Sequence, residues 1–574
     1  MCLYKKEIDV SYKCLTTVYS DNMDRVTPLS EYPRPSMRRN SYMCLNGEWD
    51  FAVAVDEPES YSDKILVPFP PESALSGYNK AVPDGYKMYY KRSFTLPDGF
   101  TKGRVILHFG AVDTVCQVYV NGTLAVQNEG GYIPFSADIT ELVREENEIS
   151  VKVTDGLDRA YPYGKQTDKR GGMWYTPVSG IWQTVWLESV PEKYIKKLKI
   201  TPALDQVKIT VVGGEDKKAL ILEDGEKIEF SGSEITYTPK EIRLWTPEAP
   251  NIYRFKITAG DDTVESYFAL REVSVREVGG IARLCLNGEP YLFNGLLDQG
   301  YFPDGIFLPA TYDGYRDDIL LAKSMGFNML RKHIKVEPEI FYYLCDTLGI
   351  ALFQDMVNNS DYSFFRDTAL PTVGLKSLSD KRWHKDRRSR EIFEREMYKT
   401  IDHLYNFPSI VYYTVFNEGW GQFCADQMYA KAKASDPTRI YDATSGWFIQ
   451  KDSDVDSRHV YFKPVKLGRR GSRPIVISEF GGYSHRVTGH LFGEKNYGYR
   501  TYEKLEDFEE AFIKLYESEI EPQVPLGISA LVYTQLSDVE DETNGIVTYD
   551  RRTVKLDSVK ISAVMERIKK KILA

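Results

Sequence analysis

The sequence has little of what marks several classes of protein. Its 7 cysteines among 574 residues are scattered, and no two have Cys-x-x-Cys spacing. Neither a disulfide framework nor a zinc site is indicated, so reduced thiols in a reducing compartment are expected. No apolar run approaches the roughly 18 residues of a membrane span. Residues 1–20 contain no apolar run of signal-peptide length, so we expect a cytoplasmic protein.

The chain also lacks an excess of positive charge. The chain carries 73 Lys and Arg against 83 Asp and Glu, a net charge of −10. A nucleic-acid partner is not expected, because such proteins need a basic face to displace counterions. The chain contains no HExxH, no glycine-rich phosphate loop and no clustered metal ligands, so the sequence points to no common metal or nucleotide chemistry.

The chain is long enough for several domains, since its 574 residues exceed the roughly 250 to 300 of a single core. Its residue patterns predict three. Residues 1–190 show short alternating apolar segments, which predict a β jelly-roll sandwich. Within them Val118–Val120 meets Asn121-Gly122, a dipeptide typical of a type I′ hairpin turn. Residues 191–277 have hairpin breaks at Gly213-Gly214, Asp224-Gly225 and Gly260-Asp261, and predict an immunoglobulin-like β-sandwich.

From residue 278 to 574 strands alternate with helices, which predicts a (β/α)8 TIM barrel. Helical spacing from Tyr315 ends at Gly326, and a second helix follows Pro338 and ends at Gly349. A further helix is expected over 382–405. Apolar runs predict eight strands, at 291–297, 327–331, 350–354, 410–416, 439–443, 458–462, 474–478 and 528–534.

Two of these strands lead directly to a glutamate. Every residue from Ile410 to Phe416 is β-branched or aromatic, and Asn417 and Glu418 follow. The strand at 474–478 is likewise followed by Glu479 and then by two glycines. The carboxyl ends of barrel strands form the open mouth of the fold. Two glutamates at the ends of strands of one barrel therefore suggest a carboxylate pair at this mouth.

Motifs of one protein family run in order from Glu31 to Arg551. They are Glu31-Tyr32-Pro33-Arg34-Pro35, residues 45–51, 130–135 and 179–186, the Asn417-Glu418 pair, and residues 478–482 and 535–542. In these motifs the chain resembles glycoside hydrolase family 2, which contains β-galactosidases, β-glucuronidases and β-mannosidases. The resemblance implies a sugar-binding jelly roll, an immunoglobulin-like sandwich and a catalytic barrel. It also implies retaining exo-hydrolysis, with Glu418 as acid/base and Glu479 as nucleophile.

The resemblance also bears on cofactors and partners. Some members bind magnesium or sodium, but ligands for neither ion can be placed in this sequence, and no cofactor is predicted to be required. The predicted partner is an oligosaccharide or glycoside substrate, with no nucleic acid and no membrane. Whether the chain forms a homo-oligomer stays open.

Three residues are predicted to act directly beside the two glutamates. Asn417 is expected to bond the sugar 2-hydroxyl, with a helix cap as the alternative. Arg331 is expected to hold Glu479 ionised, with a structural ion pair as the alternative. By the resemblance Tyr461 donates to the nucleophile, with a packing role as the alternative.

Six more residues are candidates for substrate binding. His333, Asp298 and Asp355 end three predicted strands, so each either reads a sugar hydroxyl or is a satisfied structural group. Trp420 and Trp447 either stack on a sugar face or belong to the core. Tyr533 stands where a tryptophan commonly lines the floor of the family's sugar site.

The sequence therefore predicts a retaining exo-β-glycosidase with carboxyls about 5 to 5.5 Å apart. A β-galactoside is favoured, because no Asn-x-Lys triplet, the carboxylate-reading motif of the β-glucuronidases, follows Glu479. The alternatives are a β-glucuronidase, β-mannosidase or arabinosidase, or a catalytically inert carbohydrate-binding protein. The polar loop 155–170 is expected to reach the mouth of the site.

Overall fold

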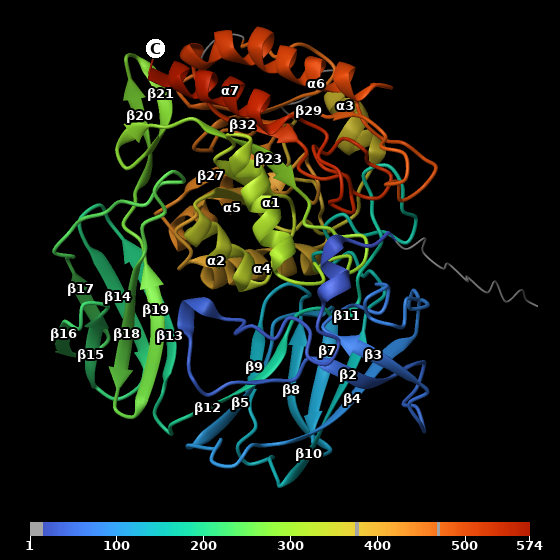
Figure 1. The fold of residues 1–574 in the computed structure, drawn as a ribbon, viewed down its shortest axis with the longest axis vertical. Helices are drawn as coiled ribbons and strands as arrows, with labels where there is room; N and C mark the ends of the chain where they lie inside the picture. The colour runs from blue at the N-terminus through green and yellow to red at the C-terminus, as the bar shows by residue number, and fades with distance from the viewer. Residues whose placement is uncertain (1–14, 373–377, 468–470, 574) are drawn as a thin grey trace, which may run out of the picture.

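The computed structural model describes residues 15–372, 378–467 and 471–573. Figure 1 shows the three predicted folds, with the jelly roll in blue to cyan, the immunoglobulin-like sandwich in green and the barrel in yellow to red. The fold class predicted from the sequence is confirmed. The exact domain limits stay predictions.

Two antiparallel sheets form the jelly roll. Asn121 and Gly122 both have positive φ, 51° and 78°, as the predicted type I′ turn requires. Two short 3-10 helices, η1 (Val18–Asn22) and η2 (Pro35–Met37), precede the sheets. The larger sheet has the order β3 (Asp63–Val67), β2 (Gly47–Ala54), β4 (Lys87–Thr95), β10 (Glu146–Thr154), β7 (Val115–Val120) and β8 (Thr123–Glu129). The second has the order β1 (Met43–Cys44), β12 (Val185–Val190), β5 (Arg104–Phe109) and β9 (Phe135–Asp138), and a small pair joins β11 (Gly180–Ile181) to β6 (Val112–Asp113).

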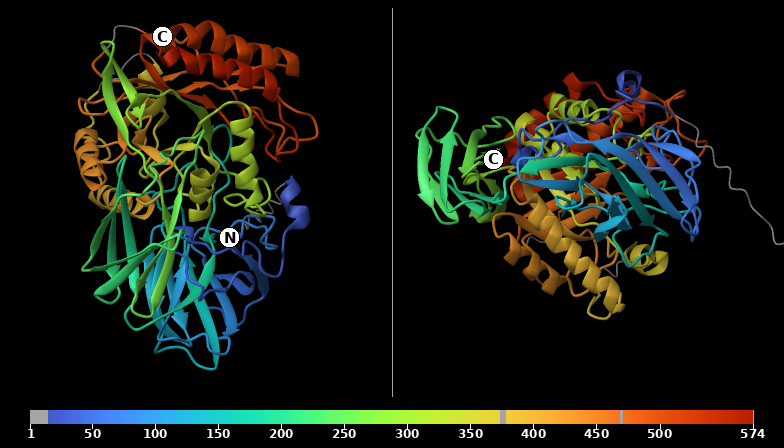
Figure 2. Two further views of the ribbon diagram at one scale, coloured as in Figure 1. Left: turned by 60° about the vertical axis from the view of Figure 1, so that its left-hand side comes forward. Right: turned by 90° about the horizontal axis from the view of Figure 1, so that it is seen from below.

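The immunoglobulin-like sandwich has a core of its own, in which Leu198, Ile209, Leu220 and Ile257 are buried. Figure 2 shows it projecting from one side of the molecule. One sheet has the order β13 (Ile195–Pro202), β14 (Val207–Gly213) and β17 (Glu234–Tyr237). The other has the order β16 (Lys227–Ser231), β15 (Lys217–Leu222), β18 (Tyr253–Ala259) and β19 (Asp262–Phe268).

A three-stranded sheet of β20 (Val273–Val278), β21 (Ile281–Leu286) and β22 (Glu289–Pro290) precedes the barrel. Its Leu284 and Leu286 share a buried cluster with Phe293 and Met329, which begin two barrel strands. The sheet therefore covers the amino-terminal end of the barrel. This leaves the opposite end, where the glutamates lie, for the site.

The barrel sheet is parallel and holds all eight predicted strands. Its order is β27 (Ile440–Ser445), β26 (Ile410–Asn417), β25 (Ala351–Asp355), β24 (Met329–Lys332), β23 (Phe293–Asp298), β32 (Ile528–Thr534), β29 (Ile475–Gly481) and β28 (Asp456–Val460). β27 and β28, the first and last strands in this order, are linked by their side chains, since Ser445 Oγ of β27 lies 2.9 Å from His459 Nε2 of β28. The last strand has the predicted bounds, and the others differ by a few residues at their ends.

Helices cover the outer face of the barrel. The predicted helix at 382 begins later, at Arg387, because the Asp386 side chain accepts a 2.7 Å bond from the Ser389 amide and caps the helix there. None of the described helices is long and apolar enough to cross a membrane. The α-helices are α1 (Asp313–Ser324), α2 (Glu339–Leu348), α3 (Leu370–Thr372), α4 (Arg387–Leu404), α5 (Ala425–Ser435), α6 (Leu505–Lys514) and α7 (Ser558–Lys569). Shorter elements are η3 (Phe365–Ala369), η4 (Leu515–Ile520), η5 (Glu521–Leu526), η6 (Lys570–Leu573), β30 (Tyr483–Ser484) and β31 (Arg500–Thr501).

The jelly roll and the barrel share one hydrophobic cluster. Trp182 is fully buried in it, and its ring centroid lies 5.1 Å from that of Phe307 in the barrel domain. Tyr132 and Tyr175 of the jelly roll join the same cluster, as does Tyr301 after β23. Through this contact, the jelly-roll residues that follow β10 lie next to the carboxyl ends of the barrel strands.

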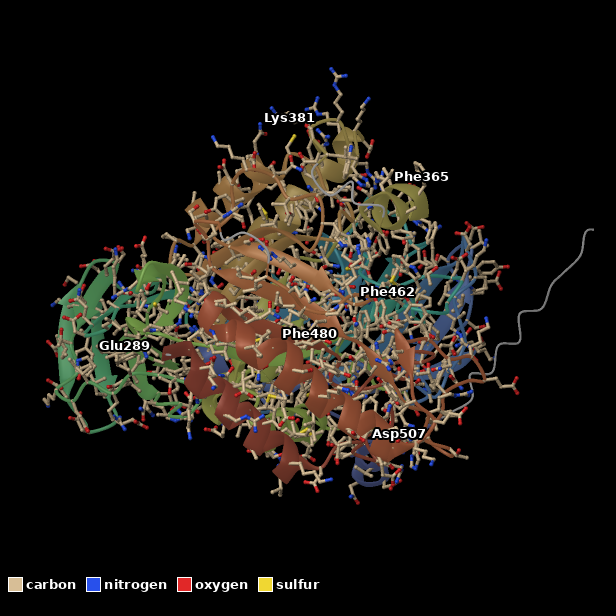
Figure 3. The ribbon with its side chains drawn as sticks, turned by 90° about the horizontal axis from the view of Figure 1, so that it is seen from above. Glu289, Phe365, Lys381, Phe462, Phe480 and Asp507 are labelled. Carbon is tan, nitrogen blue, oxygen red and sulfur yellow. The ribbon has the colours of Figure 1, made fainter. Side chains whose placement is uncertain are left out.

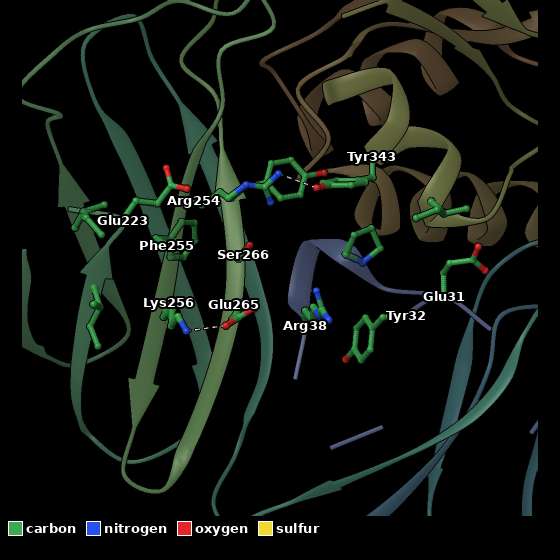
Figure 4. A pocket seen from close by; sticks show the side chains of 15 residues that line it. Glu31, Tyr32, Arg38, Glu223, Arg254, Phe255, Lys256, Glu265, Ser266 and Tyr343 are labelled. Carbon is green, nitrogen blue, oxygen red and sulfur yellow. Dashed lines mark hydrogen bonds and ion pairs between the residues drawn. The ribbon is translucent and has the colours of Figure 1, made fainter. Parts of the chain in front are cut away.

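A cavity of about 590 Å³ lies where the immunoglobulin-like sandwich, the 31–38 segment and α2 meet. Figure 4 shows Arg254 of β18 bonded to Tyr343 of α2 across it, at 2.9 Å. None of the predicted site residues lines this cavity. It is therefore separate from the site described next.

Candidate active site

The two predicted glutamates face each other at the carboxyl end of the barrel. Glu418 directly follows β26, and Glu479 lies near the end of β29. Figure 3 labels Phe480, the neighbour of Glu479, and Phe462, which lies two residues beyond β28. Glu418 is 7% exposed and Glu479 5%. One carboxylate oxygen of each lies within 4.8 Å of the other.

His459 joins the two carboxyls, and sequence reasoning missed it. Its Nδ1 lies 2.7 Å from Glu418 Oε1 and 3.5 Å from Glu479 Oε2. Spacing could have found it, because residues two apart in a strand point to the same face and Tyr461, a predicted site residue, is two positions on. Glu418 itself has φ of 52°, an uncommon backbone conformation for a side chain other than glycine.

Gly446 makes room for the His459 ring. A Cβ atom at this position would lie 2.5 Å from the ring, and the backbone φ is 85°. We expect Gly446→Ala to move the ring and to lower kcat roughly 100-fold, the loss that a displacement of about 1 Å can cause in an active site. Steady-state kinetics, with circular dichroism as a check on folding, would measure the effect. Gly489→Ala is the matched control, because it has positive φ but open space around its Cβ; equal losses in both variants would contradict this role.

Arg331 organises the Glu479 side of the site. Its Nη1 donates to Glu479 Oε1 at 3.1 Å, and its Nη2 donates to Asn417 Oδ1 at 2.8 Å. Its Nε donates to Asp355 Oδ1 at 3.0 Å. Tyr461 donates its hydroxyl proton to Glu479 Oε2. The Asn417 amide nitrogen is buried without a described partner, so it is available to a ligand.

The two glutamates have opposite pKa shifts. Burial raises the pKa of Glu418 and the charge of Glu479 adds to this, although the hydrogen bond with His459 opposes it. Burial also disfavours the ionised form of Glu479, but its interactions with His459 and Arg331 outweigh this and lower its pKa to about 2. The pKa values of the two carboxyls are therefore pushed apart, that of Glu418 upward and that of Glu479 downward.

Two of the strand-end candidates form a support beneath this pair. His333 Nδ1 lies 2.8 Å from Asp355 Oδ2, and Asp355 also accepts from Arg331. Burial lowers the pKa of His333 to about 4, against the bond with Asp355, so its ring is neutral at pH 7. Asp355 is fully buried, with both oxygens used, and so positions Arg331 and His333.

Two predicted substrate contacts are structural instead. Asp298 pairs with Lys332 at 2.6 Å, and the Lys332 ammonium lies 4.3 Å from the Phe341 ring centroid of α2, on the helix side of the sheet. Tyr533 packs against Phe512 of α6 with ring centroids 4.6 Å apart. Side chains alternate along a strand. Accordingly the next residue, Thr534, faces the site, and its Oγ1 lies 3.0 Å from the Tyr461 hydroxyl.

The jelly roll completes the mouth of the site. Trp174 stacks on Trp420 with ring centroids 5.4 Å apart, and the Tyr163 amide donates to the Asn358 carbonyl at 3.0 Å. The predicted reach of the 155–170 loop is therefore present. Trp420 is buried with its indole nitrogen unpaired among the described residues. Trp447 is half-buried, with its ring centroid 6.3 Å from that of His459.

Glu418, His459 and Glu479 are also the described residues whose atoms could together hold a metal ion. They are the same groups that the acid–base chemistry needs free. An ion bound there would compete with the reaction, so this cluster is not assigned as a metal site.

Comparisons with known families agree with this geometry. The model described as "Glycosyl hydrolase 2 galactose-binding domain-like" matches residues 80–189. The model described as "Glycosyl hydrolases family 2, TIM barrel domain" matches residues 283–568. The chain belongs to glycoside hydrolase family 2. Both matched segments of this family 2 chain contribute to the site, since Trp174 comes from the first and the glutamates from the second.

The curated relatives of the family 2 chain are named after two different activities. A "Beta-galactosidase" of Pseudoalteromonas haloplanktis is 24% identical over 80% of this chain and 49% of its own length. A "Putative beta-glucuronidase" of Formosa agariphila is 26% identical over 58% of this chain and 39% of its own. The chain thus spans about half the length, or less, of these relatives.

Solved structures share the fold over almost the whole family 2 chain. A β-D-glucuronidase of Dictyoglomus thermophilum has a TM-score of 0.73 at 19% identity, covering 94% of this chain and 98% of its own. A β-galacturonidase of Eisenbergiella tayi, bound to galacturonate, has a TM-score of 0.68 at 18% identity, covering 94% and 99%. At these identities the likeness establishes the common fold.

Proposed function

We propose that the chain is a retaining exo-β-glycosidase that releases terminal β-linked sugars. The observation that carries the proposal is the buried pair Glu418 and Glu479, with oxygens within 4.8 Å and opposite pKa shifts. Retaining enzymes hold their carboxyls about 5 to 5.5 Å apart, whereas inverting enzymes leave about 6.5 to 9.5 Å for a water molecule. The observed approach favours retention.

In the proposed mechanism Glu479 attacks the anomeric carbon while Glu418 gives its proton to the glycosidic oxygen. The aglycone leaves, and a glycosyl ester of Glu479 remains. Glu418, now ionised, takes a proton from water, which attacks the same carbon and frees Glu479. Arg331 and Tyr461 bond the Glu479 oxygens and so hold the nucleophile in place between turnovers.

A β-galactoside remains the favoured substrate. The missing Asn-x-Lys triplet supports this choice, as do the curated β-galactosidases among the relatives. Turnover of nitrophenyl β-galactoside, β-glucuronide, β-mannoside and α-arabinoside would test it. Strong activity on another sugar, with none on the galactoside, would refute the galactoside assignment while keeping the glycosidase.

The second candidate is an inert carbohydrate-binding protein. The paired glutamates speak against it, because a binding site has no need for one protonated and one ionised carboxyl beside each other. Sugar binding without release of any sugar, unchanged by replacing Glu418, would establish this alternative. The cytoplasmic location and the lack of a required cofactor stay predictions, and the question of a homo-oligomer stays open.

The pH dependence of kcat/KM follows from the two pKa shifts. Glu479 must be ionised, so activity should fall only in strong acid, as the pH drops through its pKa of about 2. Glu418 must be protonated, so activity should fall as the pH rises through its raised pKa. A bell-shaped profile with an acid limb near pH 2 is expected, and an alkaline limb that persists in Glu418→Gln would contradict the assignment.

A further inference from the structure

Lys165 places an unpaired positive charge at the candidate site. It lies in the jelly-roll segment between β10 and β11 and is 7% exposed. Its ammonium lies 5.5 Å from the ring centroid of Tyr175 and 5.8 Å from that of Trp420. The ammonium forms no hydrogen bond or ion pair with the residues that the structure describes. A buried ammonium without a partner is costly, so a group from outside is expected to meet it.

Glu542 supplies the matching acceptor from the barrel. It is 3% exposed, and its Oε2 accepts from the Tyr175 hydroxyl and from Gln535 Nε2, the latter at 3.1 Å. Its other oxygen has no hydrogen-bond donor among the described residues. Tyr175 thus contacts both groups, with its ring beside the ammonium and its hydroxyl on the carboxylate. The ammonium and the carboxylate form no direct ion pair with each other.

Both groups lie beside the reacting glutamates. Lys165 sits over Trp420, two residues after Glu418. Burial raises the pKa of Glu418 and the charge of Lys165 opposes that rise; burial likewise raises the pKa of Glu542 and the charge of Glu479 adds to it. The four groups therefore act on one another across a common space.

We propose that Lys165 and Glu542 bind two adjacent hydroxyl groups of the terminal sugar, on the side of the ring away from the anomeric carbon. The proposal rests on the glycosidase function. A hydroxyl both donates and accepts, whereas an ammonium only donates and a carboxylate only accepts, so a diol can satisfy both. A sugar carboxylate would gain the charge of Lys165 but would meet the Glu542 carboxylate as a like charge, which disfavours a uronate.

Calorimetric titration of the full chain with galactose and its 3-, 4- and 6-deoxy analogues tests this pair. Lys165→Met and Glu542→Gln should each weaken galactose binding roughly tenfold, yet should add little to the loss already caused by removing the hydroxyl that each contacts. Lys169→Met is the matched control, since this lysine is exposed on the same loop, and it should bind as the unchanged chain does.

Three results would overturn the proposal. Equal weakening of galactose and its three deoxy analogues would mean a structural role. In a parallel titration with glucuronate, a loss confined to that sugar would make Lys165 a carboxylate reader. Failure of the unchanged chain to bind galactose would exclude galactose as the ligand. The titration needs no turnover. Galactose binding with the expected coupling, but no release of sugar from any glycoside, would refute the hydrolase function and leave the diol site standing.

Discussion

Replacement of Glu479 by glycine should lower hydrolysis by roughly 10⁴-fold or more, because no other group can form the glycosyl ester. The glycine leaves a space beside Arg331 Nη1 and the Tyr461 hydroxyl, the donors that bonded the lost carboxylate. An anion such as azide can enter that space and attack the anomeric carbon directly. A single displacement inverts the carbon, so the product should be the α-glycosyl azide.

Nuclear magnetic resonance of the product and initial rates with and without azide would measure this rescue. The control is Glu494→Gly, which replaces an exposed glutamate in the loop before β31. This variant should keep full activity without azide. Formation of the β-glycosyl azide by Glu479→Gly would show that the carboxyl removed was not the nucleophile.

Replacement of Glu418 by alanine should have the second largest effect, and the loss should depend on the leaving group. A general acid contributes roughly 10² to 10⁴-fold, so nitrophenyl glycosides should be cleaved that much more slowly. Dinitrophenyl glycosides should react nearly as before in the first step, because their leaving group needs no proton. The glycosyl ester then accumulates until azide attacks it, which should give the β-glycosyl azide.

A leaving-group series for kcat/KM, with product analysis in azide, would test this expectation. Retention of Glu418→Ala activity on every leaving group would exclude it as the acid. His459→Ala offers a useful comparison, because it removes the hydrogen bond to Glu418 while keeping both carboxyls. It should displace the alkaline limb of the pH profile to higher pH, since that bond lowers the pKa of Glu418.

Much of the fold could be predicted because its strands are buried on both faces. The run from Ile410 to Phe416 has no charged residue, and the structure extends that strand by one residue, to Asn417. Such runs mark parallel strands directly. Helix ends were harder wherever a side chain decided them, as Asp386 does for α4.

The sequence predicted where each strand lies along the chain better than it predicted which of its side chains face the site. Tyr533 was predicted to line the floor of the sugar site, but its side chain packs against α6. Side chains alternate along β32, so the neighbouring Thr534 is the residue that faces the site. A one-residue change in register exchanges the two faces. Nothing in a run that is apolar throughout shows which face is which.

Contacts between domains were beyond the sequence for a different reason. Lys165 and Trp420 lie 255 positions apart in the numbering, and no local pattern links them. The loop was predicted to reach the mouth, yet the residue it delivers was not identified. Side chains from separate folds meet only through packing, which a periodicity cannot reveal.

The shared cluster around Trp182 has a consequence for how the molecule unfolds. The jelly roll and the barrel share that cluster, and Trp245 and Ala269 of the immunoglobulin-like sandwich share another with Phe293 of the barrel. Elements that share a core lose it together. Calorimetry should therefore show the jelly roll, the sandwich and the barrel melting in one cooperative transition, and a barrel expressed alone should aggregate through the exposed face of Phe307.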